Sequence, residues 1–244
     1  MTEGEMDLAQ LKAEIARLTM ENEALLKLAS HDMRSPLNKI FALVNLIKMT
    51  DDPLSQEQQD YLQSMEAILS DGLHRMRNLM DLRAIENEEI KAHWQPFDIA
   101  ALLNKLVREH QPIAHRKNIT LSLRAESLTT MSDKLILSRI VDQLLSNAVK
   151  FSPLGSEIEL LLHAGDNDYI ISIFDGGYGI SDTEQDELFK KFKVLSTPTT
   201  GGETKTGLGL FIAQFNAKRL GGKISYDNMN GSQFIIDLPY TAMA

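Results

Sequence analysis

A histidine beside an aspartate is the first feature of this sequence that could carry chemistry. His31 and Asp32 begin the heptapeptide His-Asp-Met-Arg-Ser-Pro-Leu. A neutral imidazole nitrogen can attack phosphorus near neutral pH, and an adjacent carboxylate can orient the ring and neutralise its developing positive charge. An isolated His-Asp pair is more often an accident of the surface, so this interpretation needs support from other motifs.

Two polar residues at the end of a predicted helix could bind a metal–triphosphate. Asn147 and Lys150 lie about one helical turn apart in the segment Asn-Ala-Val-Lys-Phe. The amide oxygen of Asn147 can ligate a hard cation such as Mg²⁺, and the ammonium of Lys150 can contact phosphate oxygens. Taken alone, the pair would be a helix end without a ligand.

A third segment, Asp-Gly-Gly-Tyr-Gly-Ile, follows a strand-like run and begins at Asp175. We expect the carboxylate of Asp175 at the sheet edge, where its free acceptor capacity suits the amino group of an adenine. Gly177 and Gly179 allow the backbone to approach a base and ribose closely. Alone, this segment would be an ordinary tight turn.

A fourth segment consists of Gly207, Leu208 and Gly209, which precede a helical run that begins at Leu210. Backbone N–H groups at the start of a helix can hold phosphates. The segment is not a Walker loop, because no Gly-Lys-Ser or Gly-Lys-Thr follows at the required spacing.

Found in this order, the four segments resemble the H, N, G1 and G2 boxes of the two-component sensor histidine kinases. The resemblance runs from about Leu28 to Pro239. It implies a kinase that uses ATP and Mg²⁺ to phosphorylate His31, with Asp32 polarising the imidazole and Asn147 ligating the metal.

The same resemblance implies a partner, because the phosphoryl group would pass to an aspartate of a separate response-regulator receiver domain. Many relatives also dephosphorylate that receiver, using a Thr or Asn four residues after the histidine, where this chain has Ser35. Serine lacks the methyl that restricts χ1, so we expect weak phosphatase activity.

The chain departs from the family pattern at two positions. Gln143 stands where a second Asn is common, and its extra methylene shifts the amide; Lys205 stands where many relatives carry another glycine. We expect Lys205 to stiffen the loop or to add a phosphate contact. Phe189 and Phe192 match the F box that anchors the lid, although alone they would be core aromatics of an amphipathic helix.

The elements that position the histidine are predicted to be helical. Residues 1–27 carry a heptad seam with Asn22 at an a position, which favours a two-stranded coiled coil. Residues 28–90 predict an antiparallel helical hairpin whose wide apolar face two copies bury as a dimeric four-helix bundle. Pro36 bends the first helix just past the histidine.

A polar hinge covers residues 86–95, and a new domain at residues 96–244 mixes helical and strand-like segments. We expect an α+β sandwich of one sheet and one helical layer. The helices are predicted at about Ile99–Gln111, Asp133–Phe151, Thr183–Phe192 and Gly209–Leu220, and the strands at about Ile119–Arg124, Glu157–His163, Tyr169–Asp175, Gly222–Tyr226 and Ser232–Leu238. The long segment between Ile180 and Gly207 predicts either a functional lid or a disordered loop.

Composition narrows the function classes. With 25 basic and 34 acidic residues the net charge is −9, which disfavours binding to a nucleic-acid backbone. The absence of cysteine excludes disulfides and thiolate metal sites. No apolar run is long enough for a membrane span and no basic leader follows Met1, so we expect a cytoplasmic protein whose input comes from a separate sensor protein or domain.

Other classes share part of this pattern. Gyrase-type and heat-shock-chaperone ATPases have the same nucleotide boxes but lack the histidine heptapeptide, and anti-sigma-type serine/threonine kinases usually lack the histidine hairpin. A dimeric nucleotide-binding scaffold without kinase activity is the remaining alternative. The intact Asn147, Lys150, Asp175 and site glycines argue against such decay.

Overall fold

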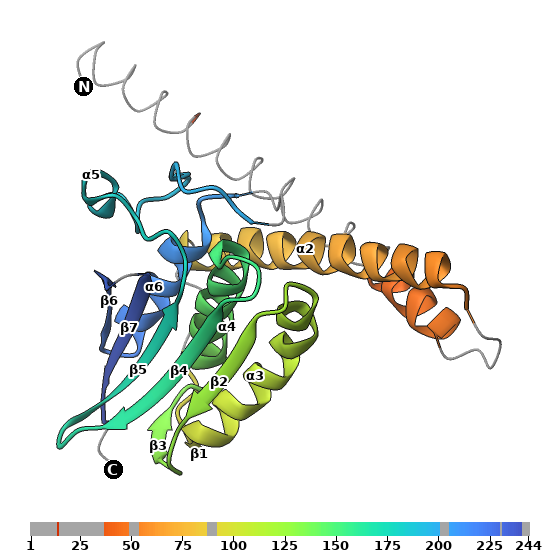
Figure 1. Cartoon of the computed structure of the whole chain (residues 1–244). Coiled ribbons are helices and arrows are strands. Elements are labelled where there is room, and N and C mark those ends of the chain that lie inside the picture. The colour runs from red at the N-terminus through yellow and green to blue at the C-terminus, as the bar shows by residue number, and fades with distance from the viewer. Residues whose placement is uncertain are drawn as a thin grey trace. The chain divides into compact units, whose positions relative to one another are not determined.

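The computed structural model describes residue 14 and residues 37–48, 54–86, 92–200, 205–229 and 231–240. The chain divides into two compact units, Met1–Glu89 and Ile90–Ala244 (Figure 1). Apart from residue 14, the predicted coiled coil of residues 1–27 lies outside the described residues. The three predicted residues of the histidine motif, His31, Asp32 and Ser35, also lie outside them.

The first unit contains an antiparallel pair of helices, residues 37–48 and α2 (Gln56–Glu86). Val44 of the first helix is buried with two leucines of α2, Leu62 and Leu69. At the turn end, Lys48 Nζ lies 2.7 Å from Glu66 Oε2. The hairpin predicted from the spacing of apolar residues therefore forms within the described part of this unit.

The start of α2 has a reciprocal cap. The backbone N–H of Gln58 donates to Ser55 Oγ (3.2 Å), and the backbone N–H of Ser55 donates to Gln58 Oε1 (2.9 Å). This capping box satisfies two backbone donors that a helix start leaves without partners.

The second unit is built on a five-stranded mixed sheet and a separate two-stranded sheet. In the larger sheet the order is β2-β4-β5-β7-β6, with β2 parallel to β4 and the other pairs antiparallel. Its strands are β2 (Thr120–Arg124), β4 (Glu157–Ala164), β5 (Asp168–Asp175), β6 (Lys223–Asn228) and β7 (Ser232–Pro239). The small sheet pairs β1 (Gln95–Asp98) with β3 (Thr129–Ser132).

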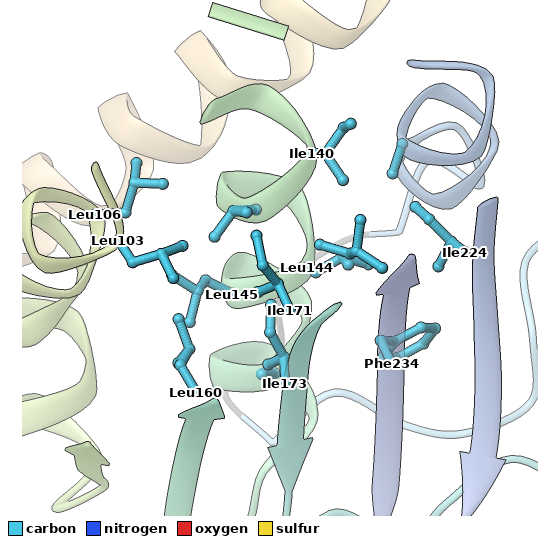
Figure 2. Close-up of a cluster of buried hydrophobic side chains, with 14 of the residues drawn as sticks. Leu103, Leu106, Ile140, Leu144, Leu145, Leu160, Ile171, Ile173, Ile224 and Phe234 are labelled. Carbon is cyan, nitrogen blue, oxygen red and sulfur yellow. The ribbon is translucent and has the colours of Figure 1, made fainter. Parts of the chain in front are cut away.

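Three helices, α3 (Ile99–Arg116), α4 (Lys134–Phe151) and α6 (Gly209–Arg219), cover one face of the larger sheet (Figure 1). Two of them begin at aspartate caps: Asp98 accepts hydrogen bonds from the first turn of α3, and Asp133 does the same for α4. Figure 2 shows Leu144 and Leu145 of α4 among apolar side chains of the strands. Burial of this apolar surface holds helices and sheet together.

The predicted α+β sandwich is confirmed, with two local differences. Sequence patterning missed the sheet formed by β1 and β3, whose strands have four residues each. The predicted helix Thr183–Phe192 is also wrong, because only α5 (Asp182–Gln185) is helical and turns follow it. Phe192 has φ 60° and is 64% exposed, so it is not a core aromatic of an amphipathic helix.

Candidate nucleotide-binding site

The amide of Asn147 is oriented by the residue one turn earlier on α4. Gln143 is buried, and its Nε2 donates to Asn147 Oδ1 at 3.3 Å. The same Nε2 lies 2.0 Å from where a Cβ on Gly209 would be placed. The extra methylene of Gln143 thus carries its amide from α4 to the first residue of α6, and Gly209 leaves the room for it.

Asp175 ends the central strand β5, between β4 and β7, and is 2% exposed. The expectation of a solvent-open sheet edge is therefore wrong. Burial raises the pKa of Asp175 to about 6, while hydrogen bonds from the Gly177 N–H and from the backbone and hydroxyl of Ser232 oppose that rise. A carboxylate has about four acceptor positions, so three donors leave about one for a further donor.

Close contacts require glycine at two positions after Asp175, Gly177 and Gly179. A Cβ on Gly177 would lie 2.6 Å from Asp175 Oδ1 and 3.3 Å from the carbonyl oxygen of Phe151. Gly179 has φ +69°, and a Cβ there would lie 2.7 Å from Asn228 Oδ1. Both positions therefore exclude larger side chains because of contacts within the protein: the turn packs against Phe151 at Gly177 and against Asn228 at Gly179.

The glycine segment before α6 passes against the predicted lid. Gly207 has φ +67°, and a Cβ there would lie 2.5 Å from the carbonyl carbon of Phe192 and 2.7 Å from the backbone nitrogen of Lys193. Only glycine fits this contact between two backbones. Leu208 is buried, and as an apolar N-cap it supplies no side-chain hydrogen bond to α6. The first-turn N–H groups of α6 thus lack a side-chain cap.

The lid segment, which we define as residues 181–200 and 205–206 within the described chain, folds back on the other motifs. Glu184 accepts hydrogen bonds from the Ser196 hydroxyl (2.6 Å) and backbone N–H (2.8 Å), which lower its pKa. The Thr197 hydroxyl donates to the carbonyl of Gly179 (3.2 Å). The lid is therefore hydrogen-bonded to the G1 turn.

The far end of this segment docks on the end of α4. Thr200 donates from its N–H to the carbonyl of Lys150 (3.0 Å) and from its hydroxyl to that of Ser152 (2.7 Å). Lys117 Nζ, from the turn after α3, donates to Thr200 Oγ1 and to the carbonyl of Val149, each at 2.9 Å. The carbonyls at the C-terminus of α4 are thus shared between a lid threonine and a lysine.

The fold brings the predicted nucleotide residues into linked sets. Gln143 joins Asn147 to Gly209, the lid joins Lys150 to Gly179, and Asp175 bonds to Gly177. Sequence reasoning missed four of their partners, because no local pattern announces a contact between distant segments: Lys117, Thr200, Asn228 and Ser232.

Among the described residues, no group of three or more His, Asp or Glu side chains could hold a metal ion. The donor set nonetheless suits Mg²⁺ brought by a nucleotide, since this ion usually keeps several waters and takes one or two protein ligands besides phosphates. The described helices include none long and apolar enough to cross a membrane.

Two protein-family models match the chain. One, described as the His Kinase A (phospho-acceptor) domain, matches residues 21–88, which contain His31. The other, described as the histidine kinase-, DNA gyrase B- and HSP90-like ATPase, matches residues 132–242. The chain belongs to the two-component sensor histidine kinases.

Several curated sensor kinases are similar to this histidine kinase over 94% or more of its length. The swarming motility regulation sensor protein RssA of Serratia marcescens is 30% identical over 240 residues, and the sensor histidine kinase GacS of Pseudomonas protegens is 31% identical over 244 residues. BarA of Escherichia coli is 30% identical over 241 residues. The kinase spans 50% of RssA and 26% of the other two.

Solved structures have the same fold. Full-length ShkA in complex with AMPPNP superposes with a TM-score of 0.63 at 25% identity, covering 90% of this kinase and 46% of ShkA. The histidine kinase AdeS of Acinetobacter baumannii gives a TM-score of 0.60 at 23% identity, covering 87% of this kinase and 98% of AdeS.

Proposed function

We propose that this chain is an ATP-dependent histidine kinase core that phosphorylates itself on His31 and passes the phosphoryl group to a response-regulator aspartate. The observation that carries the proposal is the presence, in one chain, of a phosphoacceptor-domain match that contains His31 and a second unit with the N, G1 and G2 residues. We assign residues 28–90 to the phosphoacceptor hairpin and 96–244 to the ATP-binding domain.

The residues of the second unit fit a nucleotide. Asp175 keeps about one acceptor position for the adenine amino group, and the absence of a side chain at Gly177 lets the turn pack closely beside that carboxyl. The start of α6, from Gly207 through Leu208 to Gly209, offers backbone N–H groups to phosphates. The residues expected around the base and around the phosphates are therefore all present in this chain.

The end of α4 supplies further groups for the phosphates. Lys150 supplies positive charge, and the amide oxygen of Asn147 would hold Mg²⁺, which would supply charge neutralisation to the phosphates when bound. ShkA, a relative in fold, was solved with AMPPNP, which supports an adenine nucleotide as the ligand of this kinase as well.

The proposed reaction is an in-line transfer. A neutral imidazole nitrogen of His31 attacks the γ-phosphorus, and the bond between that phosphorus and the oxygen of the leaving ADP breaks. Asp32 neutralises the positive charge that develops on the ring. The phosphohistidine then passes its phosphoryl group to a receiver aspartate. In the separate phosphatase reaction, Ser35 holds the water that hydrolyses the phosphorylated receiver only weakly.

A homodimer accounts for the apolar surface of the hairpin. Large apolar side chains of both helices are exposed in a single chain: Ile40, Leu43, Leu46, Ile47, Tyr61, Met65 and Ile68. Monomeric proteins rarely leave such a face uncovered. A second hairpin would bury it in a four-helix bundle, and the family implies dimerisation in general. Because the reaction consumes ATP, we place this core in the cytoplasm.

Radiolabelled ATP tests the proposal. We expect label on the wild-type chain that is lost in acid and kept in base, as for a phosphohistidine, and no label on His31→Gln. Nucleotide affinity should stay close to wild type in that variant, because His31 and the nucleotide site lie in different units. Labelling that survives the substitution would refute His31 as acceptor, whereas ATP hydrolysis without any labelling would favour the ATPase alternative.

A further inference from the structure

The ammonium of Lys205 is hydrogen-bonded to the backbone of the lid. Its Nζ donates to the carbonyl of Leu195 at 2.8 Å and to the carbonyl of Thr197. The same ammonium lies 5.6 Å from the ring centroid of Phe151, the last residue of α4. The side chain is half-buried, so these three contacts are partly shielded from water.

These contacts connect the two ends of a lid loop with each other and with α4, which is distant in the sequence. Lys205 stands two residues before Gly207, its two carbonyl acceptors belong to the middle of the lid, and Phe151 closes the N-box helix. Leu195 also packs against the hydrophobic core, and Thr197 bonds to Gly179. A lysine here therefore fixes a stretch of lid that touches both the core and the G1 turn.

We propose that Lys205 is a positioning residue for the nucleotide: it clasps lid residues 195–197 against the end of α4 and so keeps the lid ordered before the nucleotide arrives. This inference rests on the proposed nucleotide function of the site. Glycine, which many relatives carry at this position, has no donor that could make the clasp.

The alternative role for Lys205, a direct contact with the transferring phosphate, requires its ammonium to leave two carbonyl acceptors and an aromatic face. Hydrogen bonds from a charged donor are among the stronger ones, so this release has a cost. The two roles differ in their kinetics. A clasp changes how long nucleotide stays bound, whereas a phosphate contact changes the rate of transfer at saturating ATP.

The test compares three variants of the whole chain. Lys205→Met removes the donor and the charge but keeps an apolar stem over Phe151, and Lys205→Arg keeps a cation that can still donate to two carbonyls. Lys190→Met is the matched control, because Lys190 is an exposed lid lysine paired with Glu187 at 3.4 Å and it removes the same charge. All three keep the residues assigned to ATP.

On each variant we measure the order of the lid and the behaviour of the nucleotide. Hydrogen exchange without nucleotide follows the amides of Ser196 and Thr200, which donate to Glu184 and to the Lys150 carbonyl. Stopped-flow dissociation of a fluorescent, non-hydrolysable ATP analogue with Mg²⁺, together with kcat and KM of His31 labelling, follows the nucleotide.

For Lys205→Met we expect faster exchange at both amides, nucleotide dissociation and KM raised about 3- to 10-fold, and kcat within about 2-fold of wild type. That range allows for the partial exposure of Lys205 to water, which weakens the bonds. Lys205→Arg should restore wild-type behaviour, and Lys190→Met should match wild type in all readings.

Unchanged exchange and dissociation in Lys205→Met would overturn the clasp. A fall in kcat with KM unchanged would also overturn it, and would assign Lys205 to the phosphate instead. Equal changes in Lys190→Met would show that lid charge alone is responsible. If the wild-type chain binds no nucleotide, the proposed function fails first, and the exchange measurement still reports on the clasp.

Discussion

Replacing Asp175 with asparagine is expected to weaken nucleotide binding while leaving the fold as stable as before or more stable. The reason is the burial of this carboxyl at the end of the central strand, where it is 2% exposed and its pKa is raised to about 6. In the unfolded chain the pKa returns to its ordinary value of 3.8. The folded state therefore holds the proton more tightly than the unfolded state.

The sign of the effect follows from this difference. The contribution of Asp175 to the free energy of unfolding is highest below pH 3.8, falls as the pH rises through the window from 3.8 to about 6, and is lowest above it. A pKa difference of about 2 corresponds to about 3 kcal/mol at pH 7. Asparagine avoids that cost but leaves one donor of Ser232 or Gly177 without its acceptor, which costs about 1 kcal/mol.

The net expectation at pH 7 is a gain of about 1–2 kcal/mol in the stability of the second unit, or a rise in Tm of roughly 2–8 °C. Loss of a charged acceptor for the adenine amino group should weaken ATP about 10- to 100-fold. The stability advantage should shrink as the pH falls from about 6 and vanish below pH 3.8, where the aspartate of the wild type is protonated in both the folded and the unfolded chain.

Calorimetry measures the Tm of the transition that nucleotide shifts, and titration with an ATP analogue measures affinity, both at pH 5 and pH 7.5. Asp166→Asn, in the exposed turn between β4 and β5, controls for the loss of one negative charge. A Tm at pH 7.5 that falls together with the affinity would refute the argument and make Asp175 a structural residue.

Two further predictions concern residues where this chain differs from its relatives. Gln143→Asn shortens a buried side chain and withdraws its amide from Gly209, so we expect a loss of about 1 kcal/mol in the free energy of unfolding, with Mg²⁺-dependent nucleotide binding as strong as before or stronger. Weaker binding by titration with and without Mg²⁺ would show that the site depends on glutamine. Ser35→Thr adds the methyl that restricts χ1 and should raise phosphatase activity without lowering His31 labelling. The decay of a purified phosphorylated receiver with ADP measures it, and rapid decay with the wild type would contradict the expectation of weak activity.

Much of the fold could be predicted because its elements follow simple periodicities. Along β5 every second residue from Tyr169 to Asp175 is buried, which is the alternation expected of a strand with one covered face. The helix α4 begins directly after a capping aspartate, Asp133, and so its start was readable from one residue type. These signals depend on neighbouring residues alone, and the folded structure agrees with them.

The two-stranded sheet of β1 and β3 had no such signal. Its strands have four residues, and one of them contains Pro96, which lacks a backbone N–H. The pairing of Gln95 with Ser132 joins segments separated by the whole of α3 and β2. The strand propensity of four residues is too weak to predict a pairing across that separation, so the sheet is defined by tertiary contacts.

The candidate site shows the same division. Motif spacing predicted which residues belong to it, but the surroundings of Asp175 depend on strand order, which brings Ser232 of β7 beside it. The lid differs for another reason. Its conformation rests on hydrogen bonds from side chains to distant carbonyls, such as those of Thr200 to Lys150 and Ser152, and these leave no periodic trace in a sequence.

Both departures from the family pattern place a longer side chain near the glycines that precede and begin α6. Gln143 reaches Gly209 from α4, and Lys205 reaches from one end of the lid to Leu195 and Thr197 in its middle and to Phe151 of α4. In each case the side chain makes a connection for which the residue common in relatives is too short. A site ordered in advance by its own contacts spends less of the binding free energy of ATP on fixing loops. Lys205 is expected to act in this way on the lid, whereas the contact of Gln143 with Gly209 stabilises the fold and is not required for nucleotide affinity.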